Sequence, residues 1–402
     1  MRRWLALAAI VVLGLALVIG AACGGGEEEE EGVTELKFGI GLPLTGIYGA
    51  AVGLPCKYGY IMGAEKIGVF EVAGEQYRWK LIFEDNLFSI AGGTASAMKF
   101  IHEDHVQFMD QVGADSGLAV QPICEELGMI LITSTCEFDA FTPDRPHFFQ
   151  TSATWSIHVP VFFDWLTAEH PEVHRIAHIG LDDRTGYSVG EAITACADYY
   201  GLEIVVEEYI PVGMQEMMPV ANKIMDREPD LYVGPMAGGV EDVYGMMVAM
   251  GYDGLAACYY WTEDGADKIE WETVEGHLLF LPFPVGEVWD EVPAFCEEYD
   301  DRYGIEFAPS AFWAANMAYV MTNVLKQAGT VDDMDKIIET METESFDTLS
   351  GPIRYGLKEL NGIGHLAIYP TPIMQVVGER EYELLAYYSP EETEAIAVEV
   401  FK

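Results

Sequence analysis

Basic residues are scarce in this sequence of 402 residues. It has 21 lysines and arginines against 66 aspartates and glutamates, which gives a formal net charge of −45. Such a chain repels phosphate backbones, so nucleic-acid binding is disfavoured. The same deficit leaves no basic patch for adhesion to anionic lipid. The excess of acid fits a saline habitat or a need for solubility, and composition does not choose between the two.

Catalytic and metal-binding motifs are missing as well. No GxSxG, HExxH or P-loop pattern occurs in the sequence. No two cysteines have the CxxC spacing typical of structural zinc sites. No segment repeats with a period of about 20–50 residues, which argues against a solenoid or a propeller. We therefore expect neither enzyme activity nor a cofactor nor a bound metal.

The N-terminal segment is typical of an export signal. Arg2 and Arg3 precede an apolar run from Trp4 to Ile19, and small residues follow it. A charged start, an apolar stretch and a small-residue end predict a signal peptide over residues 1–22. The run of 16 residues is marginal for a membrane span of about 20 residues, but a retained single-span anchor is the alternative.

Cys23 differs from the other cysteines in its setting. Three glycines and five glutamates follow it, and such a stretch is flexible and repels itself. The signal resembles that of bacterial lipoproteins, which implies that Cys23 is lipidated and that residues 23–33 form a flexible acidic tether. Gly20 stands where lipoprotein signals usually have an aliphatic residue, so ordinary cleavage with release is the other possibility.

Six further cysteines are spread through the chain. Export permits disulfides, but the sequence does not determine how six cysteines would pair. The alternative is that they are small buried residues. They are Cys56, Cys124, Cys136, Cys196, Cys258 and Cys296.

Short apolar strands alternate with helical stretches in two successive runs. Repeated βα units with short turns predict parallel sheets covered by helices on both sides. The continuous apolar stretch from Met129 to Thr133 indicates burial on both faces of a sheet. Two runs of this kind predict an α/β protein with two doubly wound lobes. The expected strands are 36–40, 80–83, 106–109 and 129–133, then 175–179, 203–209, 230–234 and 256–260.

The order of several motifs resembles a known family. The sequence is similar to type I periplasmic solute-binding proteins of ABC importers, in the branched-chain amino acid group, over about residues 35–380. The motifs are LKFGIGLPLTG, KLIFEDN, QVGADSGLAVQPICEELGMILIT, RIAHIGLDDRTGYSVGEAI and DLYVGPMAGG.

This resemblance implies two lobes joined by a three-crossover hinge, with the ligand between them. Lobe 1 would comprise residues 34–150 and 284–355, and lobe 2 residues 151–283 and 356–402. Ligands of open α/β sheets sit at the carboxyl ends of the strands, which agrees with that placement. The crossovers would lie near Phe149–Thr151, Leu281–Phe283 and Tyr355.

In lobe 1 the resemblance points to residues that would hold a ligand carboxylate. Ser116, Gly117, Ser134 and Thr135 match the family positions, and hydroxyls and N–H groups at a helix start suit an anion. The alternative for Ser116 is that it caps the helix that follows. Glu137 stands where the family has a threonine. An acid at this position would repel a ligand carboxylate. Either Glu137 points elsewhere, or the ligand carries an extra cation or hydrogen-bond donor.

In lobe 2 the resemblance implies three further contacts. Tyr187 would cover the ligand, and Glu263, with Asp264 as its rival, would pair with a ligand ammonium group. Met236 occupies a position that is often aromatic in the family. Weaker candidates are Tyr48, Trp155 and Trp261.

Taken together, these features predict an exported lipoprotein of an ABC importer, at the outer face of the cytoplasmic membrane or in the periplasm. It would capture a small polar solute, an amino acid or a related amide or acid, by hinge closure. Its partners would be a permease and an ATPase, with a lipid anchor in the membrane, and we expect a monomer. A sensor or receptor domain for amides or urea-like compounds is the alternative, since fold does not decide function.

Overall fold

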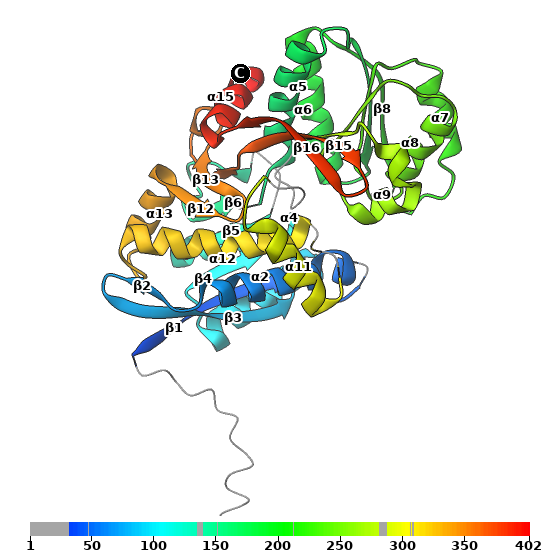
Figure 1. The fold of residues 1–402 in the computed structure, drawn as a ribbon. Helices are drawn as coiled ribbons and strands as arrows, with labels where there is room; N and C mark the ends of the chain where they lie inside the picture. The colour runs from blue at the N-terminus through cyan, green and yellow to red at the C-terminus, as the bar shows by residue number, and fades with distance from the viewer. Residues whose placement is uncertain are drawn as a thin grey trace, which may run out of the picture.

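The computed structural model describes two α/β lobes, each built around one sheet (Figure 1). The predicted signal peptide and Cys23 lie outside the described part of the chain. No described helix is both long and apolar enough to cross a bilayer. The described residues are 32–46, 48–134, 140–150, 152–211, 213–280, 288–305, 307 and 309–402.

Lobe 1 contains a nine-stranded sheet of order β12-β13-β14-β6-β5-β4-β1-β3-β2. Its centre is parallel from β6 to β3, while β2 and β13 run antiparallel to their neighbours. The strands are β1 (Val33–Leu42), β2 (Phe70–Val72), β3 (Glu75–Asp85), β4 (Phe108–Gln111), β5 (Leu131–Thr133), β6 (Phe148–Gln150), β12 (Ser345–Thr348), β13 (Gly351–Gly356) and β14 (Leu366–Ile368).

Helices cover both faces of this sheet, because successive strand residues point to opposite sides. Phe108 and Ile132 pack in one cluster with α2 and α12, while Met109 and Leu131 pack in another with α3 and α4. The lobe 1 helices are η1 (Gly49–Gly53), α2 (Leu54–Ile67), α3 (Ile90–Lys99), η2 (Phe100–Asp104), α4 (Ala114–Leu127), α11 (Val292–Tyr303), α12 (Pro309–Ala328), α13 (Met334–Thr343) and α14 (Lys358–Asn361).

Lobe 2 contains a seven-stranded sheet of order β16-β15-β11-β10-β9-β7-β8. Five strands are parallel, and the β15–β16 hairpin closes one edge in the antiparallel sense. Its elements are α5 (Trp155–Glu169), β7 (Arg175–Leu181), α6 (Arg184–Tyr200), β8 (Glu203–Ile210), α7 (Met218–Met225), β9 (Leu231–Val233), α8 (Val240–Ala249), β10 (Leu255–Cys258), α9 (Glu263–Ile269), α10 (Trp271–Val274), β11 (Leu278–Leu279), β15 (Thr371–Gly378) and β16 (Glu381–Tyr388).

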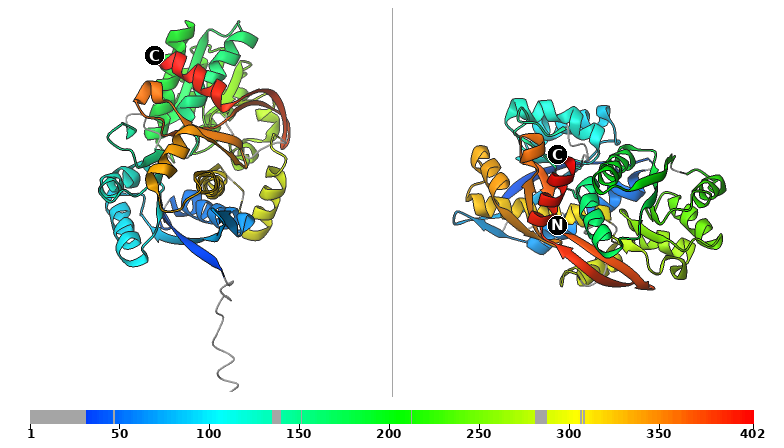
Figure 2. Two further views of the ribbon diagram at one scale, coloured as in Figure 1. Left: turned by 90° about the vertical axis from the view of Figure 1, so that its left-hand side faces the viewer. Right: turned by 90° about the horizontal axis from the view of Figure 1, so that it is seen from above.

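The chain changes sheet three times, after β6, after β11 and after β14. The resemblance suggests the last change near Tyr355, but β13, which contains Tyr355, pairs with β14 in the first sheet. The third crossing therefore follows Ile368. Helix α15 (Pro390–Phe401) then packs beside this region and contributes Ala397 and Val398 to a lobe 1 cluster and Val400 to the lobe 2 core (Figure 2).

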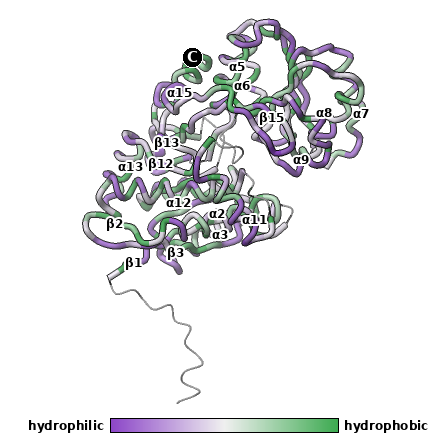
Figure 3. Tube along the Cα trace, in the orientation of Figure 1, coloured by the Kyte–Doolittle hydropathy of each residue, from purple (hydrophilic) through white to green (hydrophobic). Residues whose placement is uncertain are grey.

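Hydrophobic and hydrophilic segments alternate along the chain in both lobes, as repeated βα units require (Figure 3).

Buried cysteines belong to this apolar interior. Cys56, Cys124, Cys196 and Cys258 are buried free thiols, and Cys296 is half-buried. Cys136 lies outside the described residues.

Helices α2 and α12 approach closely because α2 carries glycine at the contact. A Cβ atom on Gly59 would lie 2.2 Å from the carbonyl oxygen of Ala311. We expect Gly59→Ala to lower the free energy of unfolding by about 1–3 kcal/mol, the usual cost of overpacking.

Chemical denaturation would measure this effect, with Gly245→Ala of α8 as the matched control. There the added Cβ would meet the side chain of Ile269 at 3.3 Å, which can shift aside. Since alanine is favoured over glycine in a helix by about 1 kcal/mol, the control should be neutral or stabilising. Equal effects of the two substitutions would contradict the close-packing explanation.

Candidate functional site

The carboxyl ends of the central strands of lobe 1 are held together by Asn86, which follows β3. Its fully buried side-chain amide donates to the carbonyl oxygens of Gly41 at 3.0 Å and Val112 at 2.8 Å, and contacts Ser116 Oγ at 3.3 Å. The ends of β1 and β4 are thereby fixed relative to the start of α4. A rigid set of strand ends is the usual support for a binding loop in this class of sheet.

Ser116 and Gly117 lie in the first turn of α4. The Ser116 hydroxyl is buried and its Oγ lies 2.9 Å from the carbonyl oxygens of both Val112 and Gly113. Gly113 itself occupies the N-cap position with φ of +106°, so Ser116 does not cap the helix. The Gly117 N–H donates to the Gly113 carbonyl at 2.9 Å.

Ser134 is brought to the same turn, since the Gly113 N–H donates to Ser134 Oγ at 3.0 Å. The structure therefore brings Ser116, Gly117 and Ser134, three of the residues predicted to hold a carboxylate, together around Gly113. Thr135 and Glu137 lie outside the described residues.

Tyr187 lies on α6, at the carboxyl end of β7 in lobe 2. The Asp183 side chain caps this helix by accepting from the Gly186 N–H at 2.8 Å. The Tyr187 ring is 45 % exposed and packs on Tyr209 with centroids 4.4 Å apart. Its hydroxyl donates to Asp182, and this hydrogen bond raises the pKa of Tyr187. The ring is thus oriented by two contacts and still accessible.

Met236 follows β9 and is buried, with an exposed fraction of 1 %. Its backbone N–H donates to the Tyr260 carbonyl at 2.7 Å, and its carbonyl accepts from the Thr262 hydroxyl at 2.6 Å. Thr262 in turn caps α9 by accepting from the Gly265 N–H. Met236 therefore joins the ends of β9 and β10.

Glu263 begins α9, and its carboxylate is engaged by the β15–β16 hairpin. Arg380 Nε donates to it at 2.6 Å and the Tyr382 hydroxyl at 3.0 Å. Arg380 also pairs with Asp267 at 2.9 Å. Asp264, beside Glu263 in the same turn, is exposed. Sequence reasoning missed Arg380, because 117 residues separate it from its partner and no local pattern signals the contact.

The two lobes meet directly through an ion pair. Asp115 in the first turn of α4 and Arg184 in the first turn of α6 approach to 3.2 Å. Their side chains are 52 % and 57 % exposed. This ion pair was not predicted from the sequence. The sequence contains only one indication of it: Asp115 adjoins the predicted site residue Ser116, and Arg184 lies in the same helical turn as the predicted site residue Tyr187. We call the zone between the carboxyl ends of the two sheets, marked by this pair, the seam.

Aromatic side chains form a second contact across the seam. Trp155 at the start of α5 packs edge-on against Trp313 of α12, with ring centroids 4.8 Å apart, and against Tyr260 at 5.4 Å. Trp155 is 5 % exposed. Trp313 contacts the clusters of both lobes. On the lobe 1 side, Tyr48 stacks on Phe88 at 4.6 Å.

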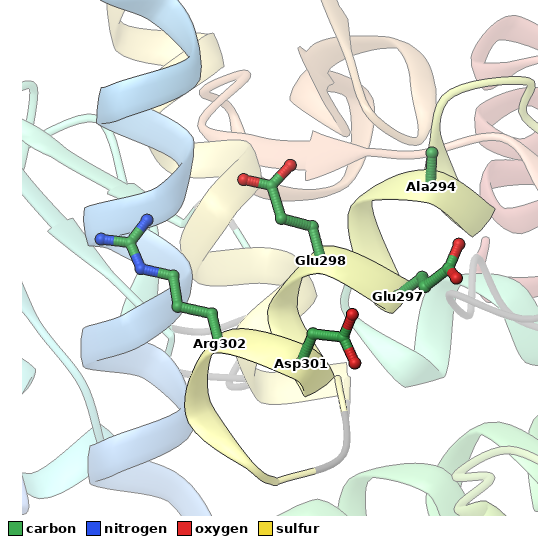
Figure 4. A pocket seen from close by; sticks show the side chains of 5 residues that line it. All are labelled: Ala294, Glu297, Glu298, Asp301 and Arg302. Carbon is green, nitrogen blue, oxygen red and sulfur yellow. The ribbon is translucent and has the colours of Figure 1, made fainter.

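Two surface hollows lie elsewhere, on lobe 1. One runs along an acidic side of α11, where Arg302 turns toward α2 and pairs with Glu65 (Figure 4). The other lies between α2 and β3 and includes Trp79. Neither is formed by the predicted site residues. Within the described ranges, no three histidine, cysteine, aspartate or glutamate side chains are grouped as a metal site would require.

Comparison with known protein families establishes the family of this chain. Residues 35–380 match the periplasmic binding protein family, which is most of the chain. The chain belongs to the periplasmic binding proteins. Proteins of this family bind solutes outside the cytoplasm and are not built around a catalytic site. No curated protein matches the sequence closely enough to count as a relative.

Solved structures share the fold of this periplasmic binding protein at low sequence identity. An ABC transporter substrate-binding protein from Sphaerobacter thermophilus is 16% identical, with a TM-score of 0.74, over 90% of this chain and 100% of its own. A leucine-binding protein from Thermotoga maritima is 19% identical, with a TM-score of 0.68, over 89% and 99%. A solute-binding protein from Rhodopseudomonas palustris, in complex with 3,4-dihydroxybenzoic acid, is 18% identical, with a TM-score of 0.70, over 89% and 98%.

Proposed function

We propose that this periplasmic binding protein captures a small polar solute, an amino acid or a related amide or acid, at the seam and delivers it to an ABC permease. The observation that carries the proposal is the Asp115–Arg184 ion pair. It joins the residues that follow β4 to those that follow β7, so the ligand-binding ends of the two sheets face each other. The solved structures that share the fold include an ABC transporter substrate-binding protein, a leucine-binding protein and an ABC transporter solute-binding protein in complex with 3,4-dihydroxybenzoic acid.

Capture would work by closure of one lobe on the other. A solute that touches both lobes gains free energy only where both surfaces contact it, so it shifts the population toward the closed state. The groups that would act are Ser134 and the first turn of α4 from lobe 1, and Tyr187 from lobe 2. The closed form would then dock on the permease, and ATP hydrolysis in a partner subunit would drive transfer.

Identification of the native solute is the direct test. Mass spectrometry of small molecules that copurify with the exported protein should reveal a solute, and adding it back should raise the melting temperature, because it binds only the folded state. X-ray scattering should show a more compact particle with the solute present. Chemical turnover of the solute, or scattering curves that superimpose for every solute that raises the melting temperature, would contradict capture by closure.

We further propose that lipidation of Cys23 anchors the protein. Cys23→Ser is expected to move the protein from the membrane fraction to the soluble fraction of the producing cell, because the acyl attachment site is lost. Fractionation followed by immunoblotting measures this, with Cys296→Ser as the control. Retention of the Cys23→Ser protein in membranes would favour an uncleaved apolar anchor instead.

A further inference from the structure

The outer side of β3 is an open edge of the lobe 1 sheet. Strand β2 is the last strand of this sheet, but it pairs only with Glu75, Gln76 and Tyr77 at the start of β3. On its other side β3 pairs with β1 as far as Asp85. The outer side of residues 79–85 therefore has no neighbouring strand within the described part of the chain. This edge lies on the side of lobe 1 that faces away from lobe 2 (Figure 1).

Two usual protections of a sheet edge are absent from this stretch. Edge strands commonly carry a proline or a bulge that discourages pairing with another chain. Residues 79–85 contain no proline, and their register with β1 has no bulge. Leu81, Ile82 and Phe83 are consecutive large apolar residues, and all three are only half-buried. Backbone N–H and C=O groups on the outer side of such an edge can pair with a further strand.

The surface beside the edge on its α2 side is hollowed. The hollow between α2 and β3 has a volume of about 330 Å³, and Trp79 and Leu81 of β3 line it with Ile61 and Val69. Val69 is 42% exposed. This face of the edge can therefore take side chains of an added strand.

On the α3 side of the edge a cation, an apolar residue and an anion follow one another. They are Lys80, Ile82 and Glu84, which share a face because alternate strand residues do. Glu84 pairs with Lys99 of α3, and Lys80 pairs with Glu35 of β1 at 2.6 Å. The Lys80 and Glu84 side chains are 49% and 26% exposed, so both are accessible. An antiparallel second copy of this row places an anion beside each cation.

Two-fold symmetry and β2 together restrict the register of such a pairing. Residue pairs of an antiparallel ladder alternate between two kinds, so two identical strands related by a two-fold axis must place one residue opposite its own copy. Strand β2 already occupies the position opposite Tyr77. The longest pairing that meets both conditions matches residues 79–85 with residues 85–79 of the second copy, and it places Ile82 on the axis.

This register is complementary on both faces of the edge. Lys80 lies opposite the second copy's Glu84, and the pair occurs twice. Leu81 lies opposite the second copy's Phe83, beside the hollow on the α2 side. A lone lysine on an edge strand discourages pairing, whereas opposite charges and apolar pairs across two strands stabilise it. With Glu35 and Lys99 the charged pairs form a row in which the sign alternates from one copy to the other.

We propose that the protein pairs with a second copy of itself through the open edge of β3, in a two-fold dimer with one continuous sheet. The sequence predicts a monomer, and the open edge with its complementary row is the structural reason for a dimer. Pairing along the side of β3 leaves the carboxyl ends of the strands uncovered, so each copy keeps its own seam. The dimer is therefore independent of which solute is captured.

Charge reversal tests the pairing by sedimentation equilibrium of the mature protein over a range of concentrations. In about 0.15 M salt the screening length of about 8 Å reduces the repulsion between two acidic copies. Lys80→Glu and Glu84→Lys should each weaken the dimer at least tenfold, because each places like charges opposite one another twice. An equimolar mixture of these two variants should associate as the wild type does, because each then meets opposite charges.

Lys223→Glu is the matched control for Lys80→Glu. Lys223 is an exposed lysine of α7 that pairs with Glu208 within lobe 2, so its reversal changes the net charge by the same amount away from the edge. This variant should associate as the wild type does. A protein that is monomeric at every concentration would overturn the proposal. A dimer that Lys80→Glu and Glu84→Lys leave intact, or a mixture that does not recover association, would overturn it too.

Cysteine crosslinking tests the register independently. Residues directly opposite in an antiparallel pair have Cα atoms about 4.5–5.5 Å apart, which suits a disulfide. Ile82→Cys should therefore give a covalent dimer on mild oxidation, beyond the background of the wild type with its native cysteines. Lys80→Cys should not, because the two copies of residue 80 would lie about 13 Å apart along the ladder. Crosslinking through Lys80→Cys in place of Ile82→Cys would overturn the proposed register.

Discussion

Replacing Asp110 with asparagine is expected to raise the free energy of unfolding at pH 8 by about 2–4 kcal/mol. Asp110 is buried on β4, in register between Ile40 of β1 and Ile132 of β5. The Tyr60 hydroxyl donates to its Oδ2 at 2.5 Å, while Oδ1 has no partner in the described structure. Burial raises the pKa of Asp110 to about 7.

The sign follows from proton binding. Between the ordinary pKa of 3.8 and the native value of about 7, the folded state binds more protons than the unfolded state. Stability therefore falls as the pH rises through this window, and the full penalty is present above it. Asparagine accepts from Tyr60 without a charge, so it removes the charge penalty. Its NH2 group is buried where Oδ1 has no partner, at a cost of about 1–2 kcal/mol, so the expected gain is below the full penalty of about 4 kcal/mol.

Urea denaturation at pH 8 and pH 5 measures the effect. The gain from Asp110→Asn at pH 5 should be less than half of that at pH 8, because the wild-type carboxyl is protonated in the fold there. Tyr60→Phe is the control, and it should destabilise at pH 8 by leaving the carboxylate without its donor. A gain that does not depend on pH would exclude the carboxyl as its source.

Acidification from pH 7 to pH 5 is expected to lower the free energy of unfolding by about 4 kcal/mol. Three histidines account for this figure, His158 on α5, His178 on β7 and His277 before β11; burial also lowers the pKa of His365, which adds to the loss. All three are buried, and desolvation lowers their pKa to about 3, 4 and 3. At pH 5 the unfolded state binds these protons and the folded state does not, so stability is lost as the pH falls below about 6.5.

Each histidine lowers the free energy of unfolding by about 2 kcal/mol between pH 7 and pH 5. Protonation of Asp110 in the folded state raises it by about 2 kcal/mol over the same range, which leaves a net loss of about 4 kcal/mol. The titration is best followed in about 1 M salt, which screens repulsion among the surface carboxylates. His277→Phe should reduce the loss by about 2 kcal/mol, because neither of its ring nitrogens has a partner within the described structure. An unaltered pH dependence in this variant would show that His277 is not among the causes.

Local patterns were enough to predict the core of the fold. The apolar run from Met129 to Thr133 contains β5, and its alternate side chains pack in different clusters on the two faces of the sheet. The edge strands β2, β12 and β16 were not predicted, because they are short or half-exposed and run antiparallel and so lack the continuous apolar character of a buried parallel strand. The central strands β6 and β14 were not predicted either, because each has only three residues, too few to show a period.

Partners across the site could not be predicted from local patterns. The motifs placed Ser116 and Ser134 at strand ends, and the structure brings both to Gly113. The engagement of Glu263 by Arg380 depends on a hairpin late in the chain. The Asp115–Arg184 contact depends on how two separate sheets face each other. Such contacts arise from tertiary geometry, which residue spacing does not encode.

The three crossings have a consequence for how such receptors diversify. Each sheet draws strands from separate stretches of the chain, with β12 to β14 completing the first and β15 and β16 the second. Recombination at a single position in the gene would therefore replace parts of both lobes. It could not exchange one lobe as an intact unit. In this architecture, point substitution at the strand ends is therefore a more accessible evolutionary path than the exchange of a whole lobe.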